Sequence, residues 1–231
     1  MSIEKEIESV INGMKSDYTC EKCGHTQEVN LFPLIDFSQN PEYYALVKDL
    51  SIYKVKCEQC GDEEFIQFDS LIVDIQHGYI LYVLSDKNNL ERFRHQITYF
   101  VETTLNKDEK FNLDEIKTRV VFSHNELLEK MSIFEVGLDD EVIETMKAGF
   151  KKMEGFDFSK YDEIRFDRME GTDLFFVAFS TKSQEVNPKA IKIDIGGYNR
   201  VVEDLAPIKN RNREYFEEID EDWVRKITKE A

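Results

Sequence analysis

The sequence has no long hydrophobic run and few residues that interrupt regular structure. Its longest uninterrupted apolar stretches are 79–84 and 174–179, with six residues each, whereas a helix that crosses a bilayer needs about 20. The 231 residues include only 4 prolines and 10 glycines, and no linker-like, low-complexity or repeated segment stands out. A transmembrane helix is therefore excluded, and we expect the parts of the chain to pack together.

Positive charge is also scarce. Lys and Arg number 30 against 47 Asp and Glu, which gives a net charge of −17 and a pI of about 4.7. Such a field repels phosphate backbones, so nucleic acid is a disfavoured partner. The amino terminus is acidic and lacks the apolar segment of a signal peptide. Since 41% of the residues are hydrophobic, we expect a folded, cytoplasmic protein.

Hydrophobic periodicity and capping residues predict an α+β fold. A zinc-ribbon-like β module comes first, a helical middle follows, and an antiparallel sheet with a closing helix ends the chain. The division expected is 1–85, 86–153 and 154–231. Predicted helices cover 2–15, 41–50, 87–105, 123–134, 139–150 and 220–229. Predicted strands cover 51–56, 63–68, 71–75, 79–84, 119–122, 164–169, 174–180 and 190–195, with 174–180 in the centre of the last sheet.

The four cysteines form two matching motifs, each followed by glycine. Cys20 and Cys23 make the first pair and Cys57 and Cys60 the second, which gives the spacing Cys-x2-Cys-x33-Cys-x2-Cys. Each pair makes a tight turn that presents two thiolates, and four thiolates are the ligand set of a closed, structural Zn²⁺ site. The alternatives are disulfides, which need an oxidising compartment, and a thioredoxin-like redox pair, which is not duplicated symmetrically.

Other candidate residues have simpler explanations. His25 follows the first pair, but four cysteines already complete a tetrahedron, so we expect a surface or supporting role. Asp139 and Asp140 begin a helix, where carboxylates cap and complement the dipole; a metal-dependent enzyme site there is the alternative. His124 and Glu126 occupy a similar position. Trp223 is expected to pack in the core.

The local charge around the cysteines bears on a nucleic-acid role. From Lys15 to Glu64 there are five lysines and ten carboxylates, a net charge of −5. A zinc ion with four thiolates adds about −2, so the module lacks the basic stripe of ribbons that bind nucleic acid. A short basic run at Lys209, Arg211 and Arg213 reads as a solvated loop.

Several segments outside the cysteine pairs resemble a known family. In order, they are TCEKCGH, NPEYYALV, VKCEQCG, LIVDIQHGYILYVL and RVVFSHNELLEKMSIFEVGLDDEVIETMK. They are similar to the CpXC domain family, over roughly residues 18–147. This resemblance implies that the four cysteines are the metal ligands. Glu21 and Glu58 stand where the family name implies proline, a change that removes turn stiffness but no ligand.

We therefore expect one structural zinc ion and no catalytic residues. The expected function is binding to another protein with a basic surface. Nucleic-acid or transcription-associated binding is the first alternative, and a metal-dependent enzyme using Asp139 and Asp140 is the second.

Overall fold

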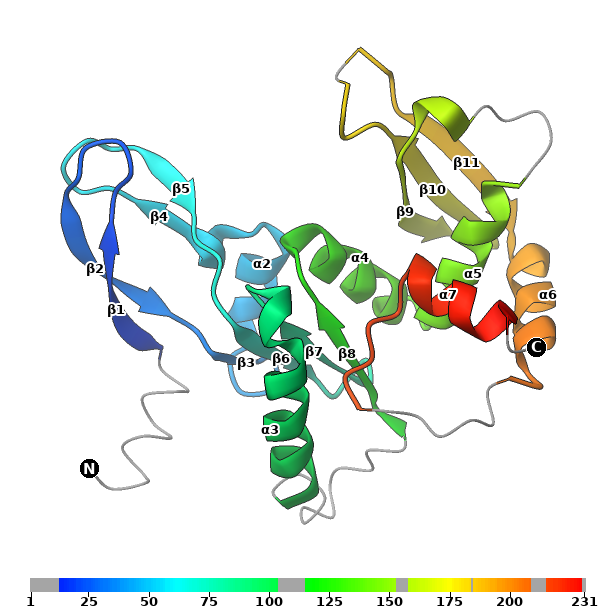
Figure 1. Cartoon of the computed structure of the whole chain (residues 1–231), viewed down its shortest axis with the longest axis horizontal. Coiled ribbons are helices and arrows are strands. Elements are labelled where there is room, and N and C mark those ends of the chain that lie inside the picture. Colours follow the sequence, from blue (N-terminus) through cyan, green and yellow to red (C-terminus); the bar gives the residue numbers. More distant parts are fainter. Residues whose placement is uncertain (1–12, 104–114, 153–157, 184, 209–214, 230–231) are drawn as a thin grey trace. The chain divides into compact units, whose positions relative to one another are not determined.

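The computed structural model describes residues 13–103, 115–152, 158–183, 185–208 and 215–229. The chain forms two compact units, residues 1–127 and residues 128–231 (Figure 1). The predicted α+β class is confirmed, with a β-rich amino-terminal region, a helical middle and a carboxyl-terminal antiparallel sheet accompanied by a helix. The three-part division at residues 85 and 153 stays a prediction. Within the described ranges, no helix is both long and apolar enough to cross a membrane.

The first unit begins with strands that form two short hairpins. β1 (Met14–Thr19) pairs antiparallel with β2 (Thr26–Leu31), and β4 (Lys54–Lys56) pairs antiparallel with β5 (Glu63–Phe65). Each turn between the paired strands contains one of the two cysteine pairs. Of the side chains in these four strands, only that of Val55 is buried. The hairpins therefore have little hydrophobic core of their own.

A four-stranded mixed sheet forms the core of the first unit. Its order is β3-β6-β7-β8, with β3 (Leu34–Asp36), β6 (Ser70–Asp74), β7 (Tyr79–Val83) and β8 (Lys117–Val121). β6 and β7 form an antiparallel hairpin, while β3 runs parallel to β6 and β8 parallel to β7. Side chains are buried on both faces of β7 and β8, which explains the continuous apolar run at 79–84.

Short helices complete the first unit. They are α2 (Glu42–Lys48), η1 (Ser51–Tyr53), η2 (Lys87–Asn89), α3 (Leu90–Thr103) and the first turn of α4 (His124–Glu135). Phe93 of α3 stacks on Tyr82 of β7 with ring centroids 3.6 Å apart. At the start of α4, the backbone N–H of Glu126 donates to Ser123 Oγ at 3.2 Å, and the Glu126 carboxylate accepts from the N–H of Phe122 at 2.8 Å. This is a variant of the capping box, in which the glutamate accepts from the residue before the N-cap.

The second unit packs helices on a three-stranded antiparallel sheet. Its elements are the rest of α4, α5 (Asp140–Phe150), η5 (Phe158–Lys160), β9 (Glu163–Glu170), β10 (Asp173–Phe179), β11 (Lys189–Asp194), α6 (Ile195–Leu205) and α7 (Glu221–Lys229). β10 is central, as predicted. Its Phe176 is fully buried and contacts Phe150 of α5 and Phe166 of β9 edge to face, at centroid distances of 4.9 and 5.6 Å.

The predicted first helix is wrong where the structure can test it. Residues 1–12 lie outside the described residues, but Met14 and Lys15 belong to β1. Gly13 has a φ of +89°, which ends any helical path before Met14. Met14 then pairs with Leu31 of β2. Cross-strand pairing therefore outweighs the helical periodicity of the apolar residues.

Two further boundaries differ from the expectation. Residues 51–53 form the 3-10 turn η1 instead of a strand, because Leu50 before them has a left-handed φ of 61°. The strand expected over 63–68 ends at Phe65. The strand expected over 119–122 is confirmed as part of β8, which adds a parallel edge to the sheet.

Helix α6 is not predicted by the sequence pattern. Ile195, expected to end a strand, begins this helix, and Asp194 caps it by accepting the Gly196 N–H at 2.8 Å. The adjacent glycines read as helix breakers. A Cβ at Gly197 would lie 2.6 Å from Ile193 Cγ2, so glycine is required there by packing.

Candidate metal centre

The two cysteine turns have the same backbone geometry. In the first, the N–H of Cys20 donates to the carbonyl of His25 at 2.9 Å, and the N–H of Gly24 donates back to the carbonyl of Cys20 at 2.9 Å. In the second, the N–H of Cys57 donates to the carbonyl of Asp62 at 2.8 Å, and the N–H of Gly61 donates to the carbonyl of Cys57 at 2.9 Å. Gly24 and Gly61 both have a φ of +72°, which only glycine adopts freely.

These turns bring four thiols together. Cys20 Sγ lies 3.7 Å from Cys60 Sγ, Cys23 Sγ lies 3.6 Å from Cys57 Sγ, and all four sulfurs lie within 4.8 Å of one another. A tetrahedron with Zn–S bonds of about 2.3 Å has edges of about 3.8 Å. The cysteines are free rather than disulfide-bonded. Their donor set and spacing thus fit a single tetrahedral ion, so the four could bind a metal.

Four thiolates in one cluster would repel one another in the absence of a cation. Backbone N–H groups, first that of Cys60, lower the pKa of the Cys57 thiol to about 6. The N–H of His25 also favours the Cys23 thiolate, but burial and the other three sulfurs outweigh it and raise the pKa of Cys23 to about 12. Four adjacent thiolates therefore repel one another, and a divalent ion would remove that cost.

Side chains outside the motifs join the two hairpins. Gln27 of β2 donates from Nε2 to the carbonyl of Lys56 at 3.0 Å and accepts from the N–H of Glu58 at 2.8 Å. Lys22 and Asp62, one on each turn, form an ion pair of 2.6 Å. The amide of Gln27 thus holds the second turn at a fixed distance from the first strand pair.

A third connection lies beside Cys20. The hydroxyl of Tyr18 donates to the carboxylate of Glu64, which lies 3.9 Å from Cys20 Sγ. The hydrogen bond to Glu64 raises the pKa of the Tyr18 phenol. Sequence reasoning did not identify Tyr18, Gln27 or Glu64, since no spacing rule points to them. The hydrogen-bond partners of these residues lie far from them in the sequence and meet them only in the folded chain.

The other candidate residues do not join this cluster. Within the described residues, the four cysteines are the only group of His, Cys, Asp and Glu side chains close enough to hold one ion. The backbone of His25 supports the first turn, and its side chain is half-buried. The ring of His124 packs against Tyr53 at 4.2 Å.

The acidic helix start has a structural explanation. Asp139 caps α5 by accepting the N–H of Glu141 at 3.0 Å, as predicted, and its own N–H donates to the hydroxyl of Tyr198 at 2.8 Å. Asp140 is fully buried and paired with Lys130 at 2.9 Å. This arrangement gives the metal-dependent enzyme alternative no open carboxylate site.

Two remaining expectations concern the carboxyl-terminal region. Val224 and Ile227 of α7 are buried, whereas Trp223, which directly precedes Val224, is half-buried. The basic run at Lys209, Arg211 and Arg213 lies outside the described residues.

Comparison with known proteins gives one match. The family model described as CpXC protein matches residues 18–147, which include both cysteine turns, the mixed sheet and the first two helices of the second unit. Neither a search of curated proteins nor a search of solved structures gave a match. Since the matched segment is more than half of the chain and has the four cysteines in one cluster, the chain belongs to the CpXC family.

Proposed function

We propose that the four cysteines bind one structural zinc ion and that the first unit is a protein-interaction module for a partner with a basic surface. The observation that carries the zinc assignment is the convergence of four free thiols from two equivalent turns. Four thiolates fill a tetrahedral ion and leave no position for water or substrate. The ion would therefore support folding instead of catalysis.

The sparse core of the hairpins supports a structural role. β1, β2 and β5 have no buried residue in their strands. Zinc binding to four thiolates contributes about 10 to 16 kcal/mol that is coupled to folding. The metal would replace the hydrophobic core that the hairpins lack. A reducing compartment such as the cytosol, which keeps thiols free, suits this proposal.

The charge of the cysteine turns supports a basic partner. Glu21 and Glu58 are exposed beside the thiols, and a zinc ion with four thiolates leaves about two negative charges there. The turn lysine, Lys22, is already paired with Asp62. The tips of the hairpins therefore present a negative surface, which attracts cations and repels nucleic acid.

Metal analysis tests the first part of the proposal. Protein purified without chelator is analysed for metals, and its thiols are titrated before and after denaturation in chelator. We expect one zinc per chain and four thiols that react only after the metal is removed. Oxidised thiols without zinc would contradict the proposal and favour the redox alternative, and a second metal would favour the enzyme alternative.

Charge reversal tests the second part. Binding of a lysine-rich peptide is measured for the zinc-loaded protein and for Glu21→Lys/Glu58→Lys, with Glu42→Lys/Glu91→Lys as a control of equal charge change at exposed helix positions. We expect salt-sensitive binding that is lost only when the turns are changed. An equal loss of peptide binding in both double variants would contradict a specific binding surface at the cysteine turns. Preferential binding of DNA would favour the nucleic-acid alternative.

A further inference from the structure

The four cysteines of the metal centre differ in their access to solvent. Cys20 and Cys57, the first cysteine of each turn, are buried, with 1% and 2% of their surface exposed. Cys23 and Cys60, the second cysteine of each turn, are exposed. The two turns are thus equivalent in exposure as well as in backbone geometry, and each presents its second cysteine to small molecules in solution.

Each exposed cysteine lies beside the buried cysteine of the other turn. Cys23 Sγ is 3.6 Å from Cys57 Sγ, and Cys60 Sγ is 3.7 Å from Cys20 Sγ. A disulfide bond is about 2.05 Å long, so an approach of roughly 1.6 Å would join the two sulfurs of either couple. Both bonds would connect the first turn to the second, which is the connection that a metal ion bound by all four sulfurs provides.

We propose that the metal centre is also a redox switch, in which hydrogen peroxide converts the four thiolates into two disulfides that join the turns, Cys23 with Cys57 and Cys20 with Cys60. This inference rests on the proposed zinc site and adds its regulation. In each couple the exposed sulfur reacts with the peroxide, and its buried neighbour completes the disulfide. The zinc ion is released, and the hairpins stay joined to each other.

The reaction balances for each couple of cysteines. The exposed thiolate attacks one oxygen of the peroxide, so an S–O bond forms, the O–O bond breaks and a hydroxide leaves. The buried thiolate then attacks the sulfur of this sulfenic acid, so an S–S bond forms, the S–O bond breaks and a second hydroxide leaves. Sulfur is oxidised and the peroxide oxygens are reduced. Both couples together consume two peroxides and release four hydroxides and the zinc ion.

The connection between the turns matters because the hairpins have almost no core. Val55 is the only buried side chain of their four strands. A disulfide within one turn, such as Cys20 with Cys23, would not join the hairpins to each other. A disulfide between Cys23 and Cys57 encloses 33 residues and removes conformational freedom from the unfolded chain. The oxidised hairpins should therefore stay folded without metal.

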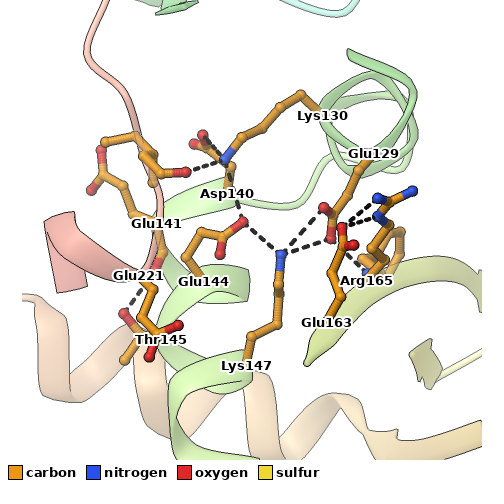
Figure 2. A network of polar contacts seen from close by, with 12 residues as sticks. Glu129, Lys130, Asp140, Glu141, Glu144, Thr145, Lys147, Glu163, Arg165 and Glu221 are labelled. Atoms are coloured by element: carbon orange, nitrogen blue, oxygen red, sulfur yellow. Dashed lines mark hydrogen bonds and ion pairs between the residues drawn. The ribbon is translucent and has the colours of Figure 1, made fainter. Parts of the chain in front are cut away.

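The second unit is held together by chemistry that a peroxide does not change. Its helices α4 and α5 are joined by a buried network of ion pairs (Figure 2). Lys130 of α4 lies 2.9 Å from Asp140 and 3.6 Å from Glu144, both on α5. Lys147 of α5 contacts both oxygens of Glu129, at 3.0 and 3.2 Å, and Glu144 at 2.9 Å. These five side chains are at most 15% exposed, and none of them is oxidised by peroxide.

The second unit is therefore an internal control for oxidative damage. All four cysteines lie in the first unit, whereas the only tryptophan, Trp223, lies in the second. We expect the fluorescence of Trp223 to keep its value while the cysteines are oxidised. A change in Trp223 fluorescence in parallel with the loss of thiols would mean general damage to the chain and would overturn the proposal.

The first experiment treats the full-length, zinc-loaded protein with hydrogen peroxide and maps its disulfides by mass spectrometry. Trypsin cleaves after Lys22 and a glutamate-specific protease after Glu58, so the two cysteines of each turn fall on different peptides. We expect release of the zinc and cross-linked peptides that pair each exposed cysteine with the buried cysteine of the other turn. Disulfides within the turns, or peroxide treatment that releases no zinc, overturn the proposal.

Hydrogen exchange of β1, β2, β4 and β5 then separates the oxidised protein from a protein that has only lost its metal. The control is the same chain, reduced and stripped of zinc by a chelator. We expect the oxidised hairpins to be protected at least about tenfold more than those of the control, since each disulfide constrains the unfolded chain. Equal protection in the two samples overturns the proposal.

Reduction separates the cysteines from the methionines. Peroxide also converts exposed methionines such as Met14 to the sulfoxide, which dithiothreitol does not reduce, whereas it does reduce disulfides. We expect dithiothreitol and added zinc to restore the four thiols and the bound metal. A loss of zinc binding that persists after this treatment overturns the switch.

Metal analysis before the peroxide is added keeps the two proposals apart. A reduced protein that holds no zinc at this stage contradicts the zinc site and the switch together. A zinc-loaded protein that then fails the disulfide, exchange or reduction test contradicts the switch alone.

Discussion

The two units concentrate charge in small volumes and neutralise it differently. In the first unit, four thiols lie within 4.8 Å of one another and could bind a cation from solution. In the second, three carboxylates surround two lysines that the chain itself supplies. The source of the countercharge decides which property of the solution controls stability. The first unit should respond to metal concentration, and the second to the integrity of its own ion pairs.

The largest expected effect is that loss of a metal ligand unfolds the hairpins of the first unit and leaves the second unit folded. Cys60→Ser removes one of four ligands, and zinc binding of about 10 to 16 kcal/mol is coupled to folding in such sites. We expect β1, β2, β4 and β5 to lose protection from hydrogen exchange while the fluorescence of Trp223 keeps its folded value. A variant that retains its metal and its protected hairpins would show that the site is not structural.

A lysine substitution tests the second unit in the same way. Lys147→Met leaves Glu129 and Glu144 without their shared cation, and breaking a buried ion pair costs about 3 to 5 kcal/mol. Lys151→Met is the control, because that lysine makes a partly exposed pair with Glu221, of a kind worth at most about 1 kcal/mol. The two free energies of unfolding are compared by Trp223 fluorescence. Equal losses would mean that burial of the network has no energetic consequence.

Replacing a glycine by alanine should destabilise the first unit and stabilise the second. Gly24→Ala places a Cβ at a φ of +72°, which costs about 1 to 2 kcal/mol although nothing lies within 4 Å of that Cβ. The metal affinity, measured by chelator competition, should fall by roughly tenfold. Gly149→Ala lies within α5 and also meets open space, so it should stabilise the second unit by about 0.5 to 1 kcal/mol. A loss of stability in both variants would contradict the strain argument.

The smallest expected effect concerns acid sensitivity of the first unit. Burial lowers the pKa of His124, and its buried Nε2 has no hydrogen-bond partner within the part of the chain that the structure describes. A histidine whose folded pKa is lowered binds fewer protons than in the unfolded chain, so stability falls as pH decreases through its unfolded value of about 6.5.

His124→Phe should keep the ring contact with Tyr53 and remove part of this pH dependence. Because the side chain is only half-buried, the change should stay well under about 1 kcal/mol. Hydrogen exchange of the first unit at pH 7.5 and 5.5 measures it, in the variant and in the wild type. Identical pH dependence in both proteins would assign the acid sensitivity to other titratable groups of the first unit.

Local features of the fold were predictable from the sequence. The cysteine turns could be found because ligand chemistry and the need for a glycine after each pair are local properties. Helix α5 was predictable because Asp139 caps it and Val142, Ile143 and Met146 form a buried stripe. The central position of β10 followed from its nearly continuous apolar residues.

Features that depend on distant partners were not predictable. Val121 of β8 pairs with Val83, 38 residues earlier, and no local signal specifies that parallel register. The acidic residues at 139 and 140 were interpreted as a helix cap, which is correct for Asp139. That interpretation misses the ion pairs of Asp140 and Lys147, whose partners Lys130 and Glu129 lie on another helix. Likewise, the contact of Gly197 with Ile193 exists only after α6 has packed.

The position of the second cysteine turn affects how the protein is made. That turn lies between β3 and β6, whose parallel register joins Leu34 to Leu71 across 37 residues, while the first turn lies before β3, between β1 and β2. A metal ion that closes both turns shortens the chain that must be searched to form this pairing. We expect a chain synthesised without metal to expose the edge of β6, which is a site for misassembly with other nascent chains. Metal supply during translation would then affect the yield of folded protein as well as its later stability.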